Sequence, residues 1–400
     1  MSAPLPAVLH QHTARLLDQL LQFAHPADAT VQQYFRKNTA LGSRDRARVA
    51  DAVFGCLRHL RRVRHAAGEG ASAEALVEAW TSGGWANLDA SMLSPAERAD
   101  LPDWLMARWP WPAGEVASAV AEAFNQPAPL DLRVNIVKAK RDAVQAALAA
   151  AGIETVAGRW APHALRVIGK PALQRHPLMV DGSIEVQDEG SQLLGQLLGA
   201  RRGEQVVDFC AGAGGKSLQI GAQMRNTGRV HAFDVSAGRL SELAQRAKRA
   251  ALGNVQPMAI RDENDVRLSR LAGKVDRVLV DAPCSGLGTL RRNPDLKWRQ
   301  GPEQLAEKAV LQGSILGAAA RLVKPGGVLV YATCSMMAEE NIGVVDAFLA
   351  EHSDFSIEPA LPALARQGVE LPDDGRSTLL LDPFHHDTDG FFAARLVRCV

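Results

Sequence analysis

The sequence predicts an α/β protein whose C-terminal half contains a mostly parallel sheet, preceded by an all-helical region. Four short apolar runs, "EQVVDFC", "GRVHAFD", "VDRVLVD" and "GGVLVYATC", are bounded by glycine or charged residues. Amphipathic stretches such as "AGRLSELAQRAKRAAL" separate these runs. Runs that are apolar on both faces, with helices between them, are typical of parallel strands covered by helices.

The length of 400 residues exceeds what one hydrophobic core usually serves, so two or three domains are expected. No stretch approaches the roughly 20 uncharged apolar residues that span a bilayer. The first residues lack the basic start and apolar run of a secretory signal. We therefore expect a cytoplasmic protein with no membrane contact.

The charge and the cysteines narrow the function classes further. The net charge is +1, so the whole chain carries no basic excess of the kind that indicates nucleic-acid binding. The local clusters "RDRARVADAVFGCLRHLRRVRH" and "LRRNPDLKWR" keep phosphate binding open. The cysteines at 56, 210, 284, 334 and 399 form no CxxC pair, which argues against disulfides and a zinc site and for reduced thiols. We expect no metal.

The first domain is predicted at 1–130. From 8 to about 125, apolar residues recur at spacings of three and four, which is typical of amphipathic helices. "LGSRDRARVADAVFG" reads as a helix start, with Ser43 as the N-cap and Asp45 in the first turn. The arginines of that helix form either a solvated charged face or an RNA-phosphate patch.

A small α+β subdomain is predicted at 131–180, between the helical region and the α/β domain at 181–400. "NQPAPLDLRVN" contains a proline break followed by a strand at 132–135. A helix at about 139–151 and a β-rich stretch through "TVAGRWAPHALRVIG" follow. This segment is too short for a full core of its own.

The first strand of the α/β domain runs into a glycine-rich loop, "VVDFCAGAGGKS" at 206–217. Such a loop lets the backbone approach a ligand near a helix N-terminus. A P-loop would need glycine where Cys210 stands. A dinucleotide fingerprint would need glycine in place of Ser217, although Gly212 and Gly214 supply its first half. S-adenosylmethionine (AdoMet) and NAD therefore remain as candidate ligands.

Two carboxylates extend this candidate site. Asp234 ends the second strand, where a carboxylate can accept both hydroxyls of a ribose. Asp262 follows the third strand and either reaches an adenine or merely caps a loop.

Two cysteines end the next two strands of the predicted sheet. Asp281 and Cys284 follow the fourth strand, and Cys334 follows the fifth. A cysteine at a strand end is usually inert core filling. Because the carboxyl ends of parallel strands line one crevice, we expect these two thiols and the carboxylate to converge beside the glycine loop.

In their order and spacing, these motifs resemble the Nol/Nop/Sun family of RNA cytosine-5 methyltransferases. The matching stretches are "VQDEGSQLL", "DFCAGAGGKS", "AFDVSAGRL", "DAPCSGLGTLRRNPD", "KPGGVLVYATCS", "EEN" and "DGFFAARL". The helical region resembles the NusB-like RNA-binding domain of the bacterial Sun (RsmB) branch, whose members methylate small-subunit ribosomal RNA. The resemblance implies a Rossmann-like AdoMet-dependent domain and an RNA partner, with no DNA or membrane, and we expect a monomer.

The resemblance also implies a role for each candidate residue. Cys334 is the nucleophile that attacks C6 of the cytosine, and Cys284 assists release of the methylated RNA. Asp281 holds the cytosine edge or the cofactor. AdoMet is bound by Asp234, Asp262, Asp281 and the loop residues Cys210, Ala211, Gly212, Ala213, Gly214, Gly215 and Lys216.

One departure from the family and three alternatives stay open. Ala213 stands where the family loop usually has proline, so the turn loses the constraint of a ring and we expect weaker cofactor binding at most. The alternatives are a tRNA substrate, an inactive RNA-binding assembly factor of the ribosome, and an NAD-linked oxidoreductase. The intact thiols and acids favour activity, and the incomplete glycine pattern argues against NAD.

Overall fold

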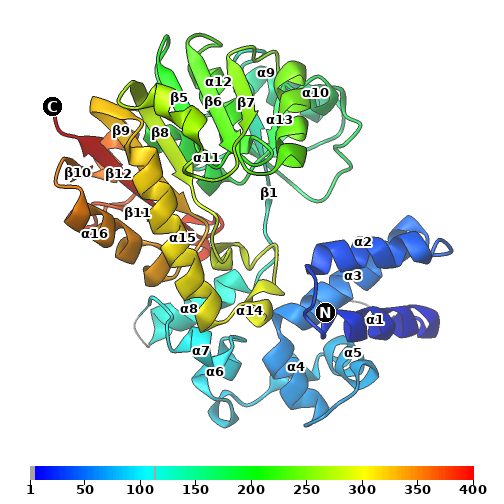
Figure 1. Cartoon of the computed structure of the whole chain (residues 1–400). Coiled ribbons are helices and arrows are strands. Elements are labelled where there is room, and N and C mark those ends of the chain that lie inside the picture. Colours follow the sequence, from blue (N-terminus) through cyan, green and yellow to red (C-terminus); the bar gives the residue numbers. More distant parts are fainter. Residues whose placement is uncertain (1–4, 112–113) are drawn as a thin grey trace. The chain divides into compact units, whose positions relative to one another are not determined.

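The computed structural model describes residues 5–111 and 114–400 of the chain (Figure 1). Its contacts divide the chain into two compact units. The first comprises Met1–Pro127 and the later segment Ser285–Gln304, and the second comprises Ala128–Cys284 and Leu305–Val400. None of the helices in the described ranges combines the length and the apolar character that crossing a bilayer requires.

The described residues of the first unit form helices and connecting turns, without β-strands. Its helices are α1 (Ala7–Leu20), α2 (Ala27–Lys37), α3 (Ser43–Arg58), α4 (Leu60–Ala67), α5 (Ala73–Ser82), α6 (Pro95–Arg98), α7 (Asp103–Met106), α8 (Glu115–Phe124) and α14 (Leu296–Arg299). The apolar faces of α1, α3 and α5 meet in a core that includes Leu17, Val53 and Val77, each with no exposed surface.

The predicted N-cap of α3 is wrong by one residue. The helix begins at Ser43, and Gly42 occupies the N-cap in an extended conformation. Asp45 lies in the first turn, as predicted. Gly42 has no side chain that could cap the helix, and no side-chain hydrogen bond caps it.

The segment Ser285–Gln304, which lies within the predicted 181–400 domain, has its contacts in the helical unit. The indole Nε1 of Trp298 donates to the Leu57 carbonyl at 3.0 Å. The Lys297 ammonium donates to the Arg58 carbonyl at 2.7 Å and to Asn125 Oδ1 at 2.8 Å. Burial of this lysine lowers its pKa to about 7. The division into domains 1–130, 131–180 and 181–400 stays a prediction.

The second unit begins with a small antiparallel sheet in the order β2-β3-β1-β4. Its elements are β1 (Leu130–Val134), α9 (Arg141–Ala150), β2 (Thr155–Ala157), β3 (Ala164–Val167), α10 (Pro177–Val180) and β4 (Ile184–Val186). The predicted strand at 132–135 and helix at 139–151 correspond to β1 and α9. Leu132, Leu148 and Leu165 form part of an apolar cluster between the sheet and α9.

The large sheet has the order β10-β12-β9-β8-β5-β6-β7, with β11 paired to β12. Its parallel strands are β5 (Gln205–Asp208), β6 (Arg229–Asp234), β7 (Val255–Ala259), β8 (Val275–Asp281) and β9 (Val323–Thr333). The strands β10 (Phe355–Glu358), β11 (Leu379–Leu381) and β12 (Phe391–Arg398) are antiparallel additions beside β9. The predicted mostly parallel α/β sheet is confirmed.

Helices cover both faces of this sheet, as its apolar strands require. One face packs against α11 (Glu189–Leu198), α12 (Gly215–Gln223), α13 (Ala237–Arg249) and α17 (Ala360–Ala365). The other face packs against α15 (Pro302–Ala320) and α16 (Ile342–Glu351). A short helix, α18 (Pro383–His386), precedes β12. Because β5, β6, β8 and β9 are parallel, their carboxyl ends meet at one edge of the sheet.

Candidate active site

The glycine loop connects β5 to α12 and has two residues in the left-handed region, Gly212 with φ of +54° and Gly214 with φ of +89°. Glycine adopts such angles without strain. At Gly214 a side chain is also excluded by space, because a Cβ there would lie 2.0 Å from Leu243 Cδ1 on α13. The loop is therefore pressed against α13 in a conformation that its glycines make accessible.

Asp234 ends β6, as predicted, and its carboxylate reaches the glycine loop. Its Oδ2 accepts a hydrogen bond from the Gly212 N–H at 2.8 Å, and its Oδ1 accepts from the Ser236 N–H at 2.8 Å. Asp262 follows β7 and is more exposed. It accepts from the Asn264 N–H at 2.9 Å and pairs with Arg261 at 2.8 Å. Asp262 thus caps a loop and also lines the pocket beside it.

A pocket of about 300 Å³ lies at the carboxyl ends of these strands. It brings together four predicted residues, Cys210, Asp234, Asp262 and Asp281. Its apolar wall includes Val235, Ile260, Pro283, Leu311 and Ile315, which sequence reasoning did not assign to a site. Leu311 and Ile315 lie one turn apart on α15, where apolar spacing does not distinguish a core face from a ligand wall.

The residues of this pocket fit AdoMet. Aliphatic side chains from α15 and from the segments after β6 and β7 can cover an adenine, and the Asp234 carboxylate offers acceptors for ribose hydroxyls. The volume is at the lower end of the range for small-molecule sites, which is about 300–1,000 Å³.

The two predicted thiols lie side by side. Cys284 follows β8 and Cys334 follows β9, and their Sγ atoms are 3.3 Å apart. Both cysteines are of intermediate exposure. The register of β8 and β9 places Asp281 opposite Ala332, which puts the two cysteine turns next to each other. The predicted convergence of Asp281, Cys284 and Cys334 at one edge of the sheet is thus present.

A largely buried cation joins the two parts of this edge. The Lys216 ammonium, from the glycine loop, lies 2.6 Å from Asp281 Oδ2. Burial alone would lower the pKa of Lys216, but the Asp281 charge raises it above its ordinary value. In contrast, burial raises the pKa of the Cys210 thiol, which disfavours a thiolate in the glycine loop.

Asp208, at the end of β5, has a strongly altered acidity. Its Oδ2 accepts a hydrogen bond from Ser217 Oγ at 2.6 Å. Burial raises the pKa of this carboxyl to about 7, and the hydrogen bond from Ser217 opposes the shift. The nearby charges of Asp281 and Asp234 also raise the pKa of Asp208, and the charge of Lys216 lowers this pKa.

The thiol pair rests on a buried polar network that sequence reasoning missed. Gln312 of α15 donates through Nε2 to the Pro283 carbonyl at 3.0 Å and to Glu340 Oε1 at 3.1 Å. Its Oε1 accepts from the Tyr331 hydroxyl at 3.2 Å. Gln312 and Glu340 have no exposed surface. Gln312 thus ties the turn that carries Cys284 to the turn that follows β9.

Asn341 fixes the residues on either side of Cys334. Thr333 Oγ1 donates to Asn341 Oδ1 at 2.6 Å, and Asn341 Nδ2 donates to the Ser335 carbonyl at 2.9 Å. The Ser335 hydroxyl donates to Glu340. The "EEN" motif therefore supports the turn of Cys334. A glutamine within an apolar helix was the signal that could have located the rest of the network, since buried polar groups need partners.

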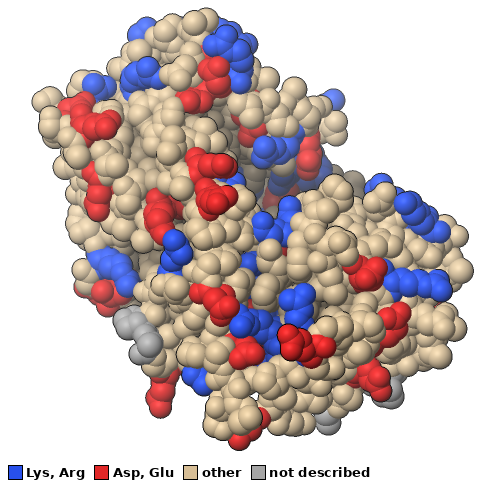
Figure 2. Space-filling view, turned by 60° about the horizontal axis from the view of Figure 1, so that its bottom comes forward, with Lys and Arg blue, Asp and Glu red and all other residues tan. Residues whose placement is uncertain are grey.

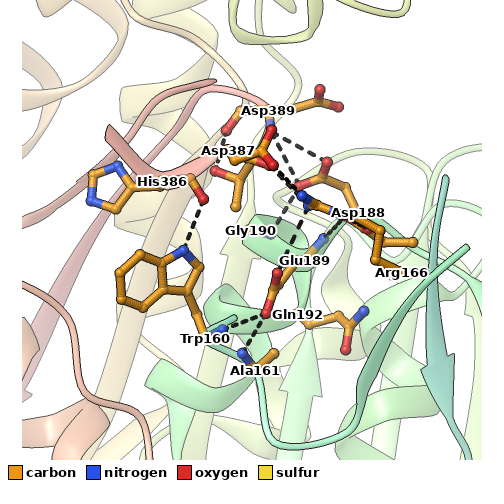
Figure 3. Close-up of polar contacts among 12 residues, drawn as sticks. Trp160, Ala161, Arg166, Asp188, Glu189, Gly190, Gln192, His386, Asp387 and Asp389 are labelled. Atoms are coloured by element: carbon orange, nitrogen blue, oxygen red, sulfur yellow. Dashed lines mark hydrogen bonds and ion pairs between the residues drawn. The ribbon is translucent and has the colours of Figure 1, made fainter. Parts of the chain in front are cut away.

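The motif "VQDEGSQLL" joins the small sheet to the chain before β12 (Figure 3). Glu189 Oε1 accepts from the backbone N–H groups of Trp160 at 2.6 Å and Ala161 at 2.7 Å. The Trp160 indole donates to the His386 carbonyl at 2.8 Å, and Arg166 pairs with Asp387. In these contacts the motif supports the fold and supplies no reacting group.

The predicted basic patch of the helical unit is partly committed to internal contacts. Arg58 Nη2 donates to the Arg291 carbonyl at 2.7 Å, and burial lowers its pKa to about 10. Arg61 pairs with Asp103 at 2.7 Å, and Arg62 pairs with Asp100 at 2.6 Å. Figure 2 shows blue and red side chains interspersed over the face in view. These three arginines make internal contacts that stabilise the helical unit.

Comparisons with known proteins point to one family. A family model described as 16S rRNA methyltransferase RsmB/F matches residues 195–397, and a model of the RsmF/B-like ferredoxin-like domain matches residues 101–174. A probable ribosomal RNA small subunit methyltransferase B of Synechocystis sp. is 38% identical over 314 residues, which cover 78% of this chain and 70% of the relative. A protein of the same name from Bacillus subtilis is 37% identical, with 73% and 65% covered.

A solved structure gives the same result for the fold. The methyltransferase homolog protein from Pyrococcus horikoshii has a TM-score of 0.65 and 29% identity, and the match covers 78% of this chain and 100% of that chain. The fold is therefore the Rossmann-like methyltransferase fold. Since the first family model spans half of the chain, and the Synechocystis relative exceeds 30% identity over 70% of its length, the chain belongs to the RsmB/F family of 16S rRNA methyltransferases and is an AdoMet-dependent enzyme.

Proposed function

We propose that this enzyme methylates C5 of a cytosine in 16S ribosomal RNA through a covalent adduct between Cys334 and C6 of the base. The observation that carries the proposal is the pair of thiols 3.3 Å apart beside the ion pair of Lys216 and Asp281. AdoMet, held by Asp234, Asp262 and the glycine loop, would supply an electrophilic methyl group.

The first step activates a carbon that is not nucleophilic by itself. The Cys334 thiolate adds to C6 and forms an S–C6 bond, and the electron pair of the C5–C6 double bond moves toward C5. C5 would then bond to the methyl group, whose bond to the AdoMet sulfur would break and leave S-adenosylhomocysteine. Asp281 would hold the polar edge of the base, and the ion pair with Lys216 would orient that carboxylate.

The second step restores the aromatic base. After methylation C5 carries both a hydrogen and a methyl group, so a base must remove the proton before the S–C6 bond can break. Cys284 lies beside Cys334, and we assign its thiolate as the base that accepts this proton and becomes a thiol. Loss of the proton reforms the double bond, expels the Cys334 thiolate and releases the RNA.

The substrate assignment rests on the family. The Synechocystis and Bacillus relatives are named as small-subunit ribosomal RNA methyltransferases, and we carry that substrate to this chain. A base inside a helix cannot reach the thiols, so we expect the cytosine to leave its stack on binding. The proposal includes RNA binding by the helical unit, monomeric action in the cytoplasm and no role for DNA or a membrane.

The test combines two cysteine variants with three RNAs. Purified parent, Cys334→Ala and Cys284→Ala proteins are incubated with labelled AdoMet and unmethylated 16S rRNA, small subunits or tRNA. Loss of the nucleophile should reduce methyl transfer roughly 1,000-fold or more. Cys284→Ala should accumulate an RNA-linked protein band on a denaturing gel. Bisulfite sequencing then locates the cytosine.

Cys399→Ala is the matched control, because this exposed thiol lies at the C-terminus. It should methylate at the parent rate. Parent-rate methylation by Cys334→Ala would refute the assigned nucleophile, and absence of the adduct with Cys284→Ala would refute the release role. Transfer to tRNA with none to 16S rRNA or subunits would replace the substrate.

A further inference from the structure

Two arginines hold the backbone of the glycine loop from outside the cofactor pocket. Arg246 Nη1 donates to the Ala213 carbonyl at 2.6 Å, and Arg133 Nη1 donates to the Gly215 carbonyl at 2.6 Å. The two contacted carbonyls flank Gly214, one of the two left-handed residues of the loop. Hydrogen bonds from ionised donors are roughly twice as strong as neutral ones, so both peptide groups are firmly oriented.

The small sheet anchors these arginines. Arg246 Nη2 donates to Glu185 Oε2 at 2.8 Å, and Glu185 is 5% exposed on β4. Arg133 lies directly opposite Glu185 in the register of β1 and β4. Arg133 also donates to Gln187, which belongs to the "VQDEGSQLL" motif. Burial would raise the pKa of Glu185, but its arginine partners lower it, so this carboxyl is ionised.

The helix that carries Arg246 also restrains the loop by packing. Leu243 lies three residues before Arg246, on the same face of α13, and its side chain occupies the space beside Gly214. The loop is thus enclosed by Leu243 on one side and by the two guanidinium groups at its carbonyls. We call Arg133, Glu185 and Arg246 the loop bracket.

The structure assigns to the loop bracket the pre-organisation of the AdoMet loop, in place of the proline ring that Ala213 lacks. The assignment rests on the proposed cofactor site. A proline would restrict the loop before folding, whereas the bracket restricts it in the folded state through its carbonyls. Arg133, Glu185 and Arg246 are therefore positioning residues for the cofactor. The small sheet contributes to AdoMet affinity although none of the three lines the described pocket.

Arg246→Met and Arg249→Met form the matched pair that tests the assignment. Both arginines bind Glu185, Arg249 at 2.7 Å, but of the two only Arg246 also donates to a carbonyl of the glycine loop in the described part of the chain. Arg246→Met should raise the AdoMet Kd, measured by calorimetry, roughly 10-fold, as expected for loss of a charge-assisted hydrogen bond. Arg249→Met should stay within roughly twofold of the parent, as for a partly exposed ion pair. In turnover assays the Arg246→Met defect should appear in KM for AdoMet, and excess AdoMet should restore the rate.

Restoring the ring provides the decisive measurement. In the Arg246→Met protein, adding Ala213→Pro should lower the AdoMet Kd at least roughly threefold. In the parent the same substitution should change the Kd less, because the loop bracket already orders the loop. If Arg246→Met proves too unstable to assay, Glu185→Gln replaces it and should weaken AdoMet binding by roughly threefold, with the same rescue by proline.

Two outcomes would overturn the assignment: equal losses for Arg246→Met and Arg249→Met, or the same effect of Ala213→Pro in both backgrounds. A parent protein that bound no AdoMet would instead refute the proposed function. The two failures are therefore distinguishable.

Discussion

The glycine loop and the thiol pair lie at neighbouring strand ends of the same sheet, but different groups hold them in place. Around the glycine loop the supporting groups are charged: Asp234 accepts from a loop N–H, and Arg133 and Arg246 donate to loop carbonyls. Around the thiols the supports are mainly amides and hydroxyls, with Gln312 and Asn341 at the centre.

This difference separates how the two regions should respond to their surroundings. The protonation of partly buried charged groups depends on pH, and removal of one such group leaves the charge of its partner uncompensated. Amide and hydroxyl networks do not titrate near neutrality, and their value is geometric. We therefore expect the cofactor side to respond to pH and charge substitution, and the thiol side to respond to shape.

The largest expected effect concerns Asp208, at the start of the glycine loop. Its pKa is about 7 in the folded protein and near 3.8 when exposed. Between these values the folded state keeps a proton that the unfolded state has lost, so this carboxyl reduces stability as pH rises from about 4 to 7. Asp208→Asn removes this effect. As pH increases from about 4 to 7, the free energy of unfolding of the variant minus that of the parent should therefore increase by at most about 4 kcal/mol.

Thermal unfolding of parent and variant at several pH values measures this difference. Ser217→Ala is the control, because it deletes the hydrogen bond that opposes the shift. That variant should keep the pH dependence and extend it to higher pH. A stability difference between parent and Asp208→Asn that did not change with pH would contradict the raised pKa.

The sequence allowed the strand ends to be predicted better than their supports. Asp234, Asp281, Cys284 and Cys334 could be placed because parallel strands end at one edge, which follows from order along the chain. Gln312 could not be placed, because helical spacing does not say which buried neighbour a polar side chain will meet. Its partners lie 28 or more residues away in sequence, apart from Tyr331.

The remaining differences have the same origin. The contacts of Arg246 with the loop depend on how α13 packs against Gly214, a distance that no local pattern encodes. The sequence of the segment Ser285–Gln304 predicts a part of the catalytic domain, yet its buried Lys297 and half-buried Trp298 form hydrogen bonds within the helical unit. Tertiary packing decided both cases.

The next effect in size concerns Asp234. Asp234→Asn keeps an oxygen for the Gly212 N–H but removes the charge that we expect to bind ribose hydroxyls. Loss of a charged hydrogen-bond acceptor should weaken the AdoMet Kd by roughly 10- to 100-fold. Calorimetry measures it, with Asp262→Asn as a comparison, because that carboxylate is more exposed and already paired with Arg261. A larger loss for Asp262→Asn would reverse the assigned ranking of the two acids.

The smallest expected effect tests the thiol side. Gln312→Leu keeps the approximate volume of the side chain but leaves the Pro283 carbonyl and the Tyr331 hydroxyl without their amide partner. The two cysteine turns should lose their fixed spacing, and the rate at saturating AdoMet should fall by roughly 10-fold, while the AdoMet Kd stays within roughly twofold of the parent.

The opposite pattern, an altered Kd with an unchanged rate, would mean that Gln312 serves the cofactor pocket, whose Leu311 wall is its neighbour. Gln304→Leu, an exposed glutamine on the same helix, controls for the substitution itself and should match the parent. The pH profile separates the two regions further. Because the network of Gln312 consists mainly of groups that do not titrate near neutrality, its loss should lower the rate by the same factor at every pH between 6 and 8, whereas the stability effect of Asp208→Asn should change with pH up to about 7.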